Sequence, residues 1–396
     1  MLLSQCSPDQ TSVDGNYITN RVRVLHAVGG MNRGGIEKLV MNLLRSAPAE
    51  HFQFDVLVRE LKPGAFDQDV RKLGVRIIPC SHADGSWTYV RRLKRILNDY
   101  GPYDVVHCHT HFFDGLILAT AAMAGVPVRI SHSHNTQDSR RTTPLRLLQR
   151  HILNIGIRTC STHRVAVSEA SYKALFGSAC YHTECSKIIR NGIDLAVFDD
   201  QPGLRAAVRR DLCIPDDVRV LGHVGRFDEQ KNHIFLLACF DELCKYNHQW
   251  RMVLVGDGPL RRSIMDRAIA LNRREHILHL GERDDVDRIL RAMDVFVFPS
   301  LYEGFGIALL EAQARGLPCL VSSQVPPEVD VGLDLVAFMD LSDGPAAWAS
   351  KVALCTRRAV SCAESKEAIT KAGFNIRDRI PEWLQLYTLS QHGAST

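Results

Sequence analysis

The stretch from Arg21 to Ser46, "RVRVLHAVGGMNRGGIEKLVMNLLRS", decides the fold class of this chain. Its apolar beginning, "RVRVLHAV", predicts a buried strand, and the apolar residues of "IEKLVMNLLRS" recur at helical spacing. The glycine-rich "GGMNRGG" joins the two. A strand, a glycine-rich turn and a helix in this order indicate a doubly wound α/β unit, whose ligands bind beyond the carboxyl ends of the strands.

Strands and helices keep alternating along the chain, which predicts parallel sheets covered on both faces. A second series starts with "VRVLGHVGR", after the turn-rich "RNGIDLAVFDDQPG". Because 396 residues are too many for one core, we expect two Rossmann-like, doubly wound domains facing a central cleft. The predicted divisions are a polar extension over 1–20, an N-terminal domain over 21–190, a linker over 191–217, a C-terminal domain over 218–375, and a last segment over 376–396 whose helix crosses back to the N-terminal domain.

The composition is that of an ordinary globular protein, with 45% hydrophobic and 23% charged residues and a net charge of +4. This small charge does not favour a nucleic-acid partner. The beginning of the chain lacks the apolar core of a signal peptide, and no apolar run reaches the ~18 residues of a membrane span, so we expect a cytoplasmic protein. Twelve scattered cysteines indicate reduced thiols. Cys180 and Cys185 lack a second pair, which argues against zinc there.

The segment "EGFGIALLE", from Glu303 to Glu311, places two carboxylates around two glycines at the start of a helix. Gly304 and Gly306 allow close backbone approach, and the first N–H groups of the helix are free to bind oxygen. Carboxylates accept hydrogen bonds from the neighbouring hydroxyls of a sugar or a ribose. Because the helix is apolar almost all round, a merely solvated Glu311 is not expected there.

Two further segments follow predicted strands and suit phosphate groups. In "GRFDEQKNH", Arg226 and Lys231 are cations that a diphosphate would need, since a departing diphosphate gains charge in the transition state. Two surface cations near a turn are the alternative. In "GGMNRGG", consecutive glycines before a helix allow N–H groups to approach a phosphate, with a plain tight turn as the alternative.

The segments "HCHTH" and "SHSHNT" carry His107, His109, His111, His132 and His134. Alternate residues of a strand share a face, so a His-x-His pair resembles a metal site. No acidic cluster accompanies these pairs, and we therefore favour histidines that line a polar cleft. His134 is the one expected to contact the reacting group, whereas strand-end structural roles remain the alternative for His107, His111 and His132.

These motifs together resemble the large retaining glycosyltransferase family four, which has the GT-B fold. The resemblance runs from Arg21 to the C-terminus and depends most on "GRFDEQKN" together with the E-x7-E segment. The segments "MNRGGIE" and "SHSHNT" are most similar to the corresponding segments of bacterial exopolysaccharide and capsule transferases. Further matching segments, in chain order, are "DVVHCH", "RNGID", "LVGDGP", "HLGERDDV" and "PSLYEGFGIALLEAQARGLP".

The resemblance implies a role for each motif residue. Arg226 and Lys231 would bind the donor diphosphate, and Glu311 the ribose. Glu303 would hold the transferred sugar, with His134 at the reacting sugar. His109 would lie on the acceptor side, in the N-terminal domain. The implied donor-binding set is Gly34, Gly35, Gly225, Arg226, Lys231, Gly256, Gly258, Arg283, Glu303, Gly304, Phe305, Gly306, Ile307 and Glu311, and the implied catalytic set is His134, Arg226, Lys231 and Glu303.

The implied activity is retaining, metal-independent hexosyl transfer from a nucleotide sugar, UDP-sugar rather than GDP-sugar, without a cofactor. The acceptor would be a saccharide or a polyprenyl-linked saccharide in exopolysaccharide or capsule synthesis. Because no carboxylate nucleophile is evident, we favour front-side displacement, in which the leaving diphosphate helps to deprotonate the acceptor. The alternatives are a sugar-nucleotide epimerase on the same fold, a non-catalytic sugar-nucleotide binder, and a His-x-His metallohydrolase.

The segment "SRRTTPLRLLQRHILNIGIR" mixes arginines with leucines and isoleucines. Its arginines are Arg140, Arg141, Arg146, Arg150 and Arg158. Such a basic amphipathic stretch suits an anionic membrane surface, at the inner face where lipid-linked acceptors reside. A packed helix with a solvated basic face is the alternative.

Overall fold

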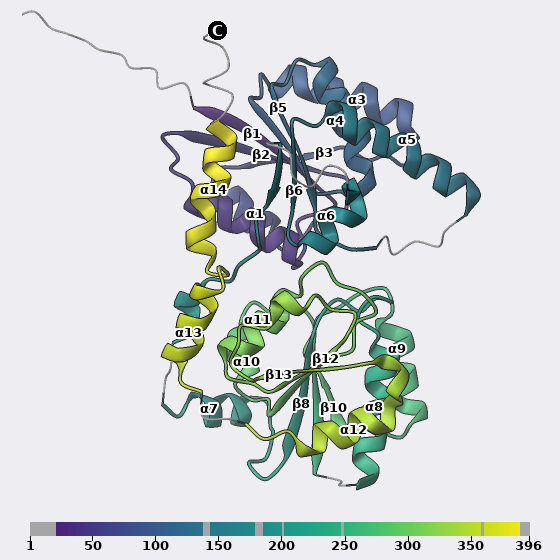
Figure 1. The fold of residues 1–396 in the computed structure, drawn as a ribbon, viewed down its shortest axis with the longest axis vertical. Helices are drawn as coiled ribbons and strands as arrows, with labels where there is room; N and C mark the ends of the chain where they lie inside the picture. Colours follow the sequence, from purple (N-terminus) through teal and green to yellow (C-terminus); the bar gives the residue numbers. More distant parts are fainter. Residues whose placement is uncertain are drawn as a thin grey trace, which may run out of the picture.

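The computed structural model describes residues 21–137, 143–178, 185–199, 202–246, 249–357 and 360–388. Two domains lie along the long axis of the molecule, each built on one parallel sheet (Figure 1). The alternation of strands and helices predicted from the sequence is therefore confirmed. The predicted extension over 1–20, together with Arg140, Arg141 and Cys180, lies outside the described residues.

The N-terminal domain has a seven-stranded sheet in the order β3-β2-β1-β4-β5-β6-β7. Its strands are β1 Val22–Val28, β2 Phe52–Val58, β3 Arg76–Pro79, β4 Val105–Cys108, β5 Val128–Ser133, β6 His163–Ala166 and β7 Ser186–Ile188. Its helices are α1 Gly35–Ser46, α2 Asp67–Lys72, α3 Ser86–Tyr100, α4 Asp114–Met123, α5 Pro144–Cys160 and α6 Glu169–Phe176. The central strands are buried along almost their whole length because helices cover both faces.

The C-terminal domain has a six-stranded sheet in the order β10-β9-β8-β11-β12-β13. Its strands are β8 Arg219–Val224, β9 Trp250–Val255, β10 Ile277–His279, β11 Val295–Phe298, β12 Cys319–Ser322 and β13 Val336–Met339. Its helices are α8 His233–Tyr246, α9 Arg261–Ala270, α10 Val286–Leu290, α11 Ile307–Ala314, α12 Gly344–Leu354 and α13 Cys362–Lys371. In both sheets the strand order reverses beside the first strand of the domain, which is the switch point where such sheets bind ligands.

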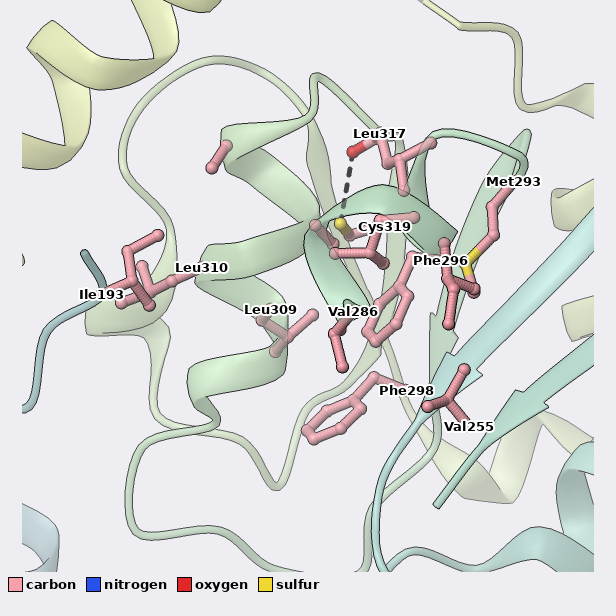
Figure 2. Close-up of a cluster of buried hydrophobic side chains, with 14 of the residues drawn as sticks. Ile193, Val255, Val286, Met293, Phe296, Phe298, Leu309, Leu310, Leu317 and Cys319 are labelled. Carbon is pink, nitrogen blue, oxygen red and sulfur yellow. Dashed lines mark hydrogen bonds between the residues drawn. The ribbon is translucent and has the colours of Figure 1, made fainter. Parts of the chain in front are cut away.

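Apolar packing fixes the position of α11 (Figure 2). Leu309 and Phe298 belong to one buried cluster, in which Leu310 lies near Ile193 of the connection between the domains. All four side chains are almost completely buried. The start of α11 is therefore held rigidly at the edge of the sheet that faces the other domain.

Two chain segments cross between the domains side by side. Ile193 and Asn375 form an isolated parallel bridge, and the backbone N–H of Ile193 donates to the carbonyl of Phe374 at 2.9 Å. After this crossing, α14 (Ile376–Thr388) packs against the N-terminal domain, where Trp383 and Tyr387 are fully buried (Figure 1). The C-terminal helix is thus part of the N-terminal core.

The connection also contains a helix that was not predicted, directly after its turn-rich part. This helix, α7 (Leu204–Asp211), carries Arg205 and Arg209, which bind Asp294 at 2.6 and 3.4 Å. It therefore packs onto the C-terminal domain. Among the helices that the structure describes, none is long and apolar enough to cross a membrane, and the described cysteines are free thiols.

Candidate functional site

A cavity of about 820 Å³ lies between the two domains. Its N-terminal wall is one face of α1, from the loop before it to Arg45, together with Phe66 and Asp69. Its other wall consists of the loops after β8 and β9, residues 282–287 and α11. Residues 192–194, Val197 and Phe198 of the connection complete the lining. The cavity thus lies beyond the carboxyl ends of strands from both sheets, as expected for a ligand site in doubly wound folds.

Glycines allow the two loops of the C-terminal wall to pack directly against each other. Gly256 has φ +128°, and a Cβ atom there would lie 2.1 Å from the carbonyl oxygen of Gly225. A Cβ atom on Gly258 would lie 2.5 Å from the carbonyl oxygen of Phe227. These predicted site glycines therefore have a packing reason as well as a place in the cavity wall.

The cavity brings together about half of the residues that were predicted for the site. Those in its lining are Gly34, Gly225, Arg226, Gly256, Gly258, Arg283, Ile307 and Glu311. Those outside its lining are Gly35, Lys231, Glu303, Gly304, Phe305, Gly306, His109 and His134. Two residues of this second group, Gly35 and Lys231, contact the lining. A Cβ atom on Gly35 would lie 3.2 Å from Cδ1 of the lining residue Ile307. Cγ of Lys231 would lie 3.1 Å from a Cβ atom on the lining residue Gly225.

Glu311 has the partner that its apolar helix called for. Its side chain is largely buried, and its Oε1 lies 2.6 Å from Nζ of Lys38, on α1 of the other domain. A second ion pair crosses the cleft nearby, between Arg33 and Asp284 at 2.5 Å. Sequence reasoning missed Lys38, although it lies one helical turn after Gly34 and so on the same face of α1.

Glu37 is another cavity residue that the sequence did not single out. Its carboxylate accepts hydrogen bonds from the backbone N–H groups of Gly34 and of Glu37 itself. Burial raises the pKa of Glu37 to about 7, while the nearby Arg226 opposes this rise. Of the glycines expected to approach a phosphate, Gly34 therefore faces a carboxylate of its own helix.

Arg283 lies at the rim of the cavity in a bidentate pair with Asp285, with its Nε and one terminal nitrogen 2.8 and 2.9 Å from the two carboxylate oxygens. Hydrogen bonding to Arg283 lowers the pKa of Asp285. The pair fixes the guanidinium plane beside the loop over 282–287.

The second carboxylate of the E-x7-E segment also has a cationic partner. Oε1 of Glu303 lies 2.5 Å from Nζ of Lys231, which also lies 4.6 Å from the ring centre of Phe298. Glu303 is only 5% exposed. The ion pair thus fixes the position of Lys231, which was predicted to bind a diphosphate, through Glu303, which was predicted to bind the sugar.

The backbone around Gly304 contacts the N-terminal domain directly. Thr136 donates to the carbonyl of Glu303 at 3.1 Å, and Ser168 donates to the carbonyl of Gly304 at 2.7 Å. A Cβ atom on Gly304 would lie only 1.7 Å from the carbonyl oxygen of His134. Glycine is therefore required here for the two domains to touch.

The remaining residues of this segment contribute through the backbone. Phe305 is 3% exposed, and its ring lies 4.7 Å from that of Phe374, so it faces the core rather than the cavity. Gly306 has φ +94° and begins α11, a conformation that glycine adopts at little cost.

Four of the five predicted histidines lie in a hydrogen-bonded cluster toward the ends of three neighbouring strands. His109 bonds His134 through Nδ1 at 2.9 Å and His26 through Nε2 at 3.1 Å. His107 bonds His132 at 3.3 Å and Tyr387 at 2.8 Å. Burial lowers the pKa of His134 and of His26 to about 3, so both imidazoles are neutral near pH 7.

His26 was not predicted, because a single histidine in an apolar strand resembles a core residue. Its signal is its register, since it lies directly opposite His107 on β4. His111 begins a short 3-10 helix (His111–Phe113) with φ +60° and is not part of these hydrogen bonds.

Two Rossmann-like domains that face each other across a lined cleft are the GT-B architecture, and the matched family models define the chain as a glycosyltransferase. More closely, the chain belongs to glycosyltransferase family 4. Residues 33–197 match the model described as Glycosyltransferase Family 4, and residues 205–336 match the model described as Glycosyl transferases group 1. The first matched region contains β2 to β7, and the second contains β8 to β12.

Known proteins similar to this chain agree with that membership. EpsF of Bacillus subtilis (strain 168), assigned to the glycosyltransferases, is 36% identical over 94% of this chain and 98% of its own length. The UDP-Gal:alpha-D-GlcNAc-diphosphoundecaprenol alpha-1,3-galactosyltransferase of Escherichia coli is 27% identical over 77% of this chain and 80% of its own length. Anabaena HepE, solved in complex with UDP and glucose, superposes with a TM-score of 0.74 at 17% identity over 93% of this chain and 100% of HepE.

Proposed function

We propose that this glycosyltransferase is a retaining, metal-independent enzyme that transfers a sugar from a UDP-sugar. Its acceptor is a saccharide carried on a polyprenyl diphosphate, in the synthesis of an exopolysaccharide or a capsule-type glycan. The observation that carries the proposal is the interdomain cavity, in which Arg226 and Glu311 face one space. Its volume of about 820 Å³ is in the range of small-molecule sites. The donor and the lipid-linked acceptor named for the Escherichia coli relative support the same substrates.

Each charged group has a role in this proposal. Glu311 accepts hydrogen bonds from the ribose hydroxyls, and Arg226 binds the diphosphate from the loop after β8. Lys231 neutralises the departing phosphate while its ion pair with Glu303 fixes its position. Glu303 and the backbone of Gly304 hold hydroxyl groups of the transferred sugar, next to His134.

The proposed reaction is a front-side displacement. The bond between the anomeric carbon and the phosphate oxygen breaks, and its electron pair leaves with the diphosphate. The acceptor oxygen attacks from the same face and passes its proton to the departing phosphate oxygen. Arg226 and Lys231 stabilise the charge that develops, and removing one such group typically costs about 3–4 kcal/mol of barrier. Glu303 is paired with Lys231 at 2.5 Å, which favours a binding role over that of a nucleophile.

The test is a transfer assay with a panel of UDP-hexoses and a polyprenyl-diphosphate-linked saccharide. We expect a product whose new linkage keeps the α configuration of the donor, as read by NMR coupling constants, with full activity in the presence of a chelator. A β-linked product would contradict retention, and loss of activity on chelation would contradict metal independence. Conversion of the UDP-sugar without an acceptor would instead indicate an epimerase.

We further propose that α5 rests on an anionic membrane surface at the inner face of a membrane. Leu145, Leu148, Ile152 and Ile155 are exposed and recur at three- or four-residue spacing, so they form one apolar stripe on the helix. The same helix carries several arginines, and α5 lies at the outer edge of the N-terminal domain (Figure 1). Apolar side chains beside cations are the combination that binds anionic lipid headgroups.

Liposome flotation tests this surface. Wild-type protein should float with vesicles that contain anionic lipid and not with neutral vesicles, and Leu148→Ser combined with Ile152→Ser should abolish flotation. Leu61→Ser is the control, because Leu61 is at least as exposed as Leu148 and Ile152 but lies outside α5. Equal flotation of the α5 variant and the control variant would contradict the proposal.

A further inference from the structure

We propose that His109, His132 and His134 form a binding site for a divalent transition-metal ion that prefers imidazole ligands, with Zn²⁺ as the natural candidate. The site lies in the N-terminal domain. It goes beyond the proposed transfer reaction, with which it shares His134 but which needs no bound metal.

The sheet itself brings these side chains together. Strands β4 and β5 are neighbours in the sheet, and Cys108 lies opposite Ser131 in their register. The next residues, His109 after β4 and His132 on β5, are therefore neighbours, and His134 follows His132 by two residues. Because alternate residues of a strand share a face, His132 and His134 lie on the same side of the sheet.

Their spacing suits a metal ion. One nitrogen from each of the three imidazoles lies within 4.8 Å of the other two. Nδ1 of His109 and Nε2 of His134 are 2.9 Å apart. Tetrahedral zinc with Zn–N bonds of about 2.0–2.1 Å needs nitrogens separated by about 3.3 Å, so small side-chain rotations are sufficient.

A buried nitrogen without a partner provides an independent indication of a ligand. Nε2 of His132, which would coordinate the ion, is buried and has no hydrogen-bond partner within the part of the chain that the structure describes. His132 is 0% exposed. Buried polar atoms are normally paired, so this nitrogen calls for a bound group.

The surrounding hydrogen bonds orient the imidazoles for coordination. If Nδ1–H of His107 donates to Tyr387, Nε2 of His107 accepts the proton of His132 Nδ1. Nε2 of His132 then carries a lone pair. Nε2–H of His109 likewise donates to His26, which leaves a lone pair on Nδ1. Outer hydrogen bonds that fix the tautomer in this way are typical of histidine metal ligands.

Metal binding requires one proton to move within His134, and no proton leaves the protein. The proton that His109 and His134 share moves from Nε2 of His134 to its Nδ1, the nitrogen that has no partner. Nε2 of His134 is then free to coordinate. The metal ion takes the place of that proton between the two rings.

The structure offers a second trio, His26, His107 and His109, which fits less well. All three of its members are fully or almost fully buried. A dication there would be enclosed without a carboxylate, which is costly. His134 is only partly buried, so an ion bound to the first trio is less completely enclosed.

The test is metal binding by untagged protein that has been stripped with a chelator. We expect equilibrium dialysis to show one tightly bound Zn²⁺ per chain, together with a rise in melting temperature. His132→Phe keeps a ring against Trp383 and should weaken binding at least about tenfold. His163→Gln, on the neighbouring strand β6, is the control and should bind like the wild type. A stripped wild-type protein that takes up no Zn²⁺, or a His132→Phe variant that binds equally well, would overturn the site.

Cobalt spectroscopy keeps the proposal testable if the His132→Phe variant does not fold. Co²⁺ bound by the wild-type protein should give the visible bands of tetrahedral nitrogen coordination. A sulfur-to-cobalt charge-transfer band would place the ion on cysteine and overturn the histidine site. Neither measurement depends on sugar transfer, so failure of the transferase assay and failure of the metal site are distinguishable.

Discussion

Lys38 and Glu311 form an ion pair that spans the cleft, with Nζ 2.6 Å from Oε1. Lys38 belongs to the N-terminal domain and Glu311 to the C-terminal domain, and both line the cavity. The carboxylate that we assign to the ribose is thus bonded to an ammonium group of the opposite wall. Donor binding must compete with this contact, so the pair couples the occupancy of the cavity to the contact between the domains.

The first prediction concerns this competition. Lys38→Met leaves Glu311 without its partner, and we expect a loss of about 1 kcal/mol in the free energy of unfolding, because Lys38 is itself 37% exposed. Affinity for UDP should rise several-fold, since the ribose no longer displaces Lys38. Calorimetric titration with UDP measures the affinity, and an unchanged dissociation constant would show that Lys38 and the ribose do not compete.

A second prediction separates the two carboxylates of the E-x7-E segment. Glu303→Gln keeps the shape of the side chain but removes the charge that holds Lys231 at 2.5 Å. Turnover should fall about 10²–10³-fold, because the cation for the leaving group is no longer fixed in position. The dissociation constant for UDP should change little, in contrast to Glu311→Gln. A Glu303→Gln enzyme with near-normal turnover would remove Glu303 from the proposed site.

The third prediction concerns the direct contact between the domains. Gly304→Ala places a Cβ atom 1.7 Å from the carbonyl oxygen of His134, so the two domains must separate. Turnover should fall on the order of 100-fold, because displacing reacting groups by about 1 Å has an effect of that size. Gly29→Ala is the control, since its Cβ atom would have only Glu60 nearby, at 4.0 Å. Small-angle scattering should detect a more open molecule for Gly304→Ala alone.

Glu37 predicts a specific dependence of stability on pH. Burial raises its pKa from 4.5 to about 7, so between these values the folded state binds more protons than the unfolded state. The free energy of unfolding therefore falls as pH rises through this window. Glu37→Gln removes this loss of stability. Near pH 8 the free energy of unfolding of the variant should exceed that of the wild type by about 1–3 kcal/mol, and near pH 4 it should not. Urea unfolding at both pH values measures the difference, and parallel pH profiles would contradict it.

The fold was predictable because its signals are local. The strand and helix patterns of "RVRVLHAV" and "IEKLVMNLLRS" correspond to β1 and α1 within a few residues. The need of Glu311 for a partner was also predictable, since its helix is apolar around it. In contrast, α7 directly follows the turn-rich segment and was not predicted, and the role of its arginines depends on Asp294, which is distant in sequence.

The rest of the site depends on how two domains meet, which no local pattern encodes. Lys38 reaches Glu311 across 273 positions of the sequence, and His26 joins the histidine cluster only through strand pairing. Glu37 lies in the first turn of α1, and its raised pKa arises from burial at the cleft. Charged residues one turn beyond a glycine-rich loop are the signal that would have identified both Glu37 and Lys38.

The most direct test of the central claim is a thermal-shift titration with UDP and UDP-sugars. A donor at about a hundred times its dissociation constant should stabilise the wild-type protein by about 2.7 kcal/mol. The same concentration should stabilise Glu311→Ala and Lys231→Ala much less. A wild-type protein that shows no shift with any nucleotide sugar, or variants that shift as much as the wild type, would contradict the assignment of the donor site to this cleft.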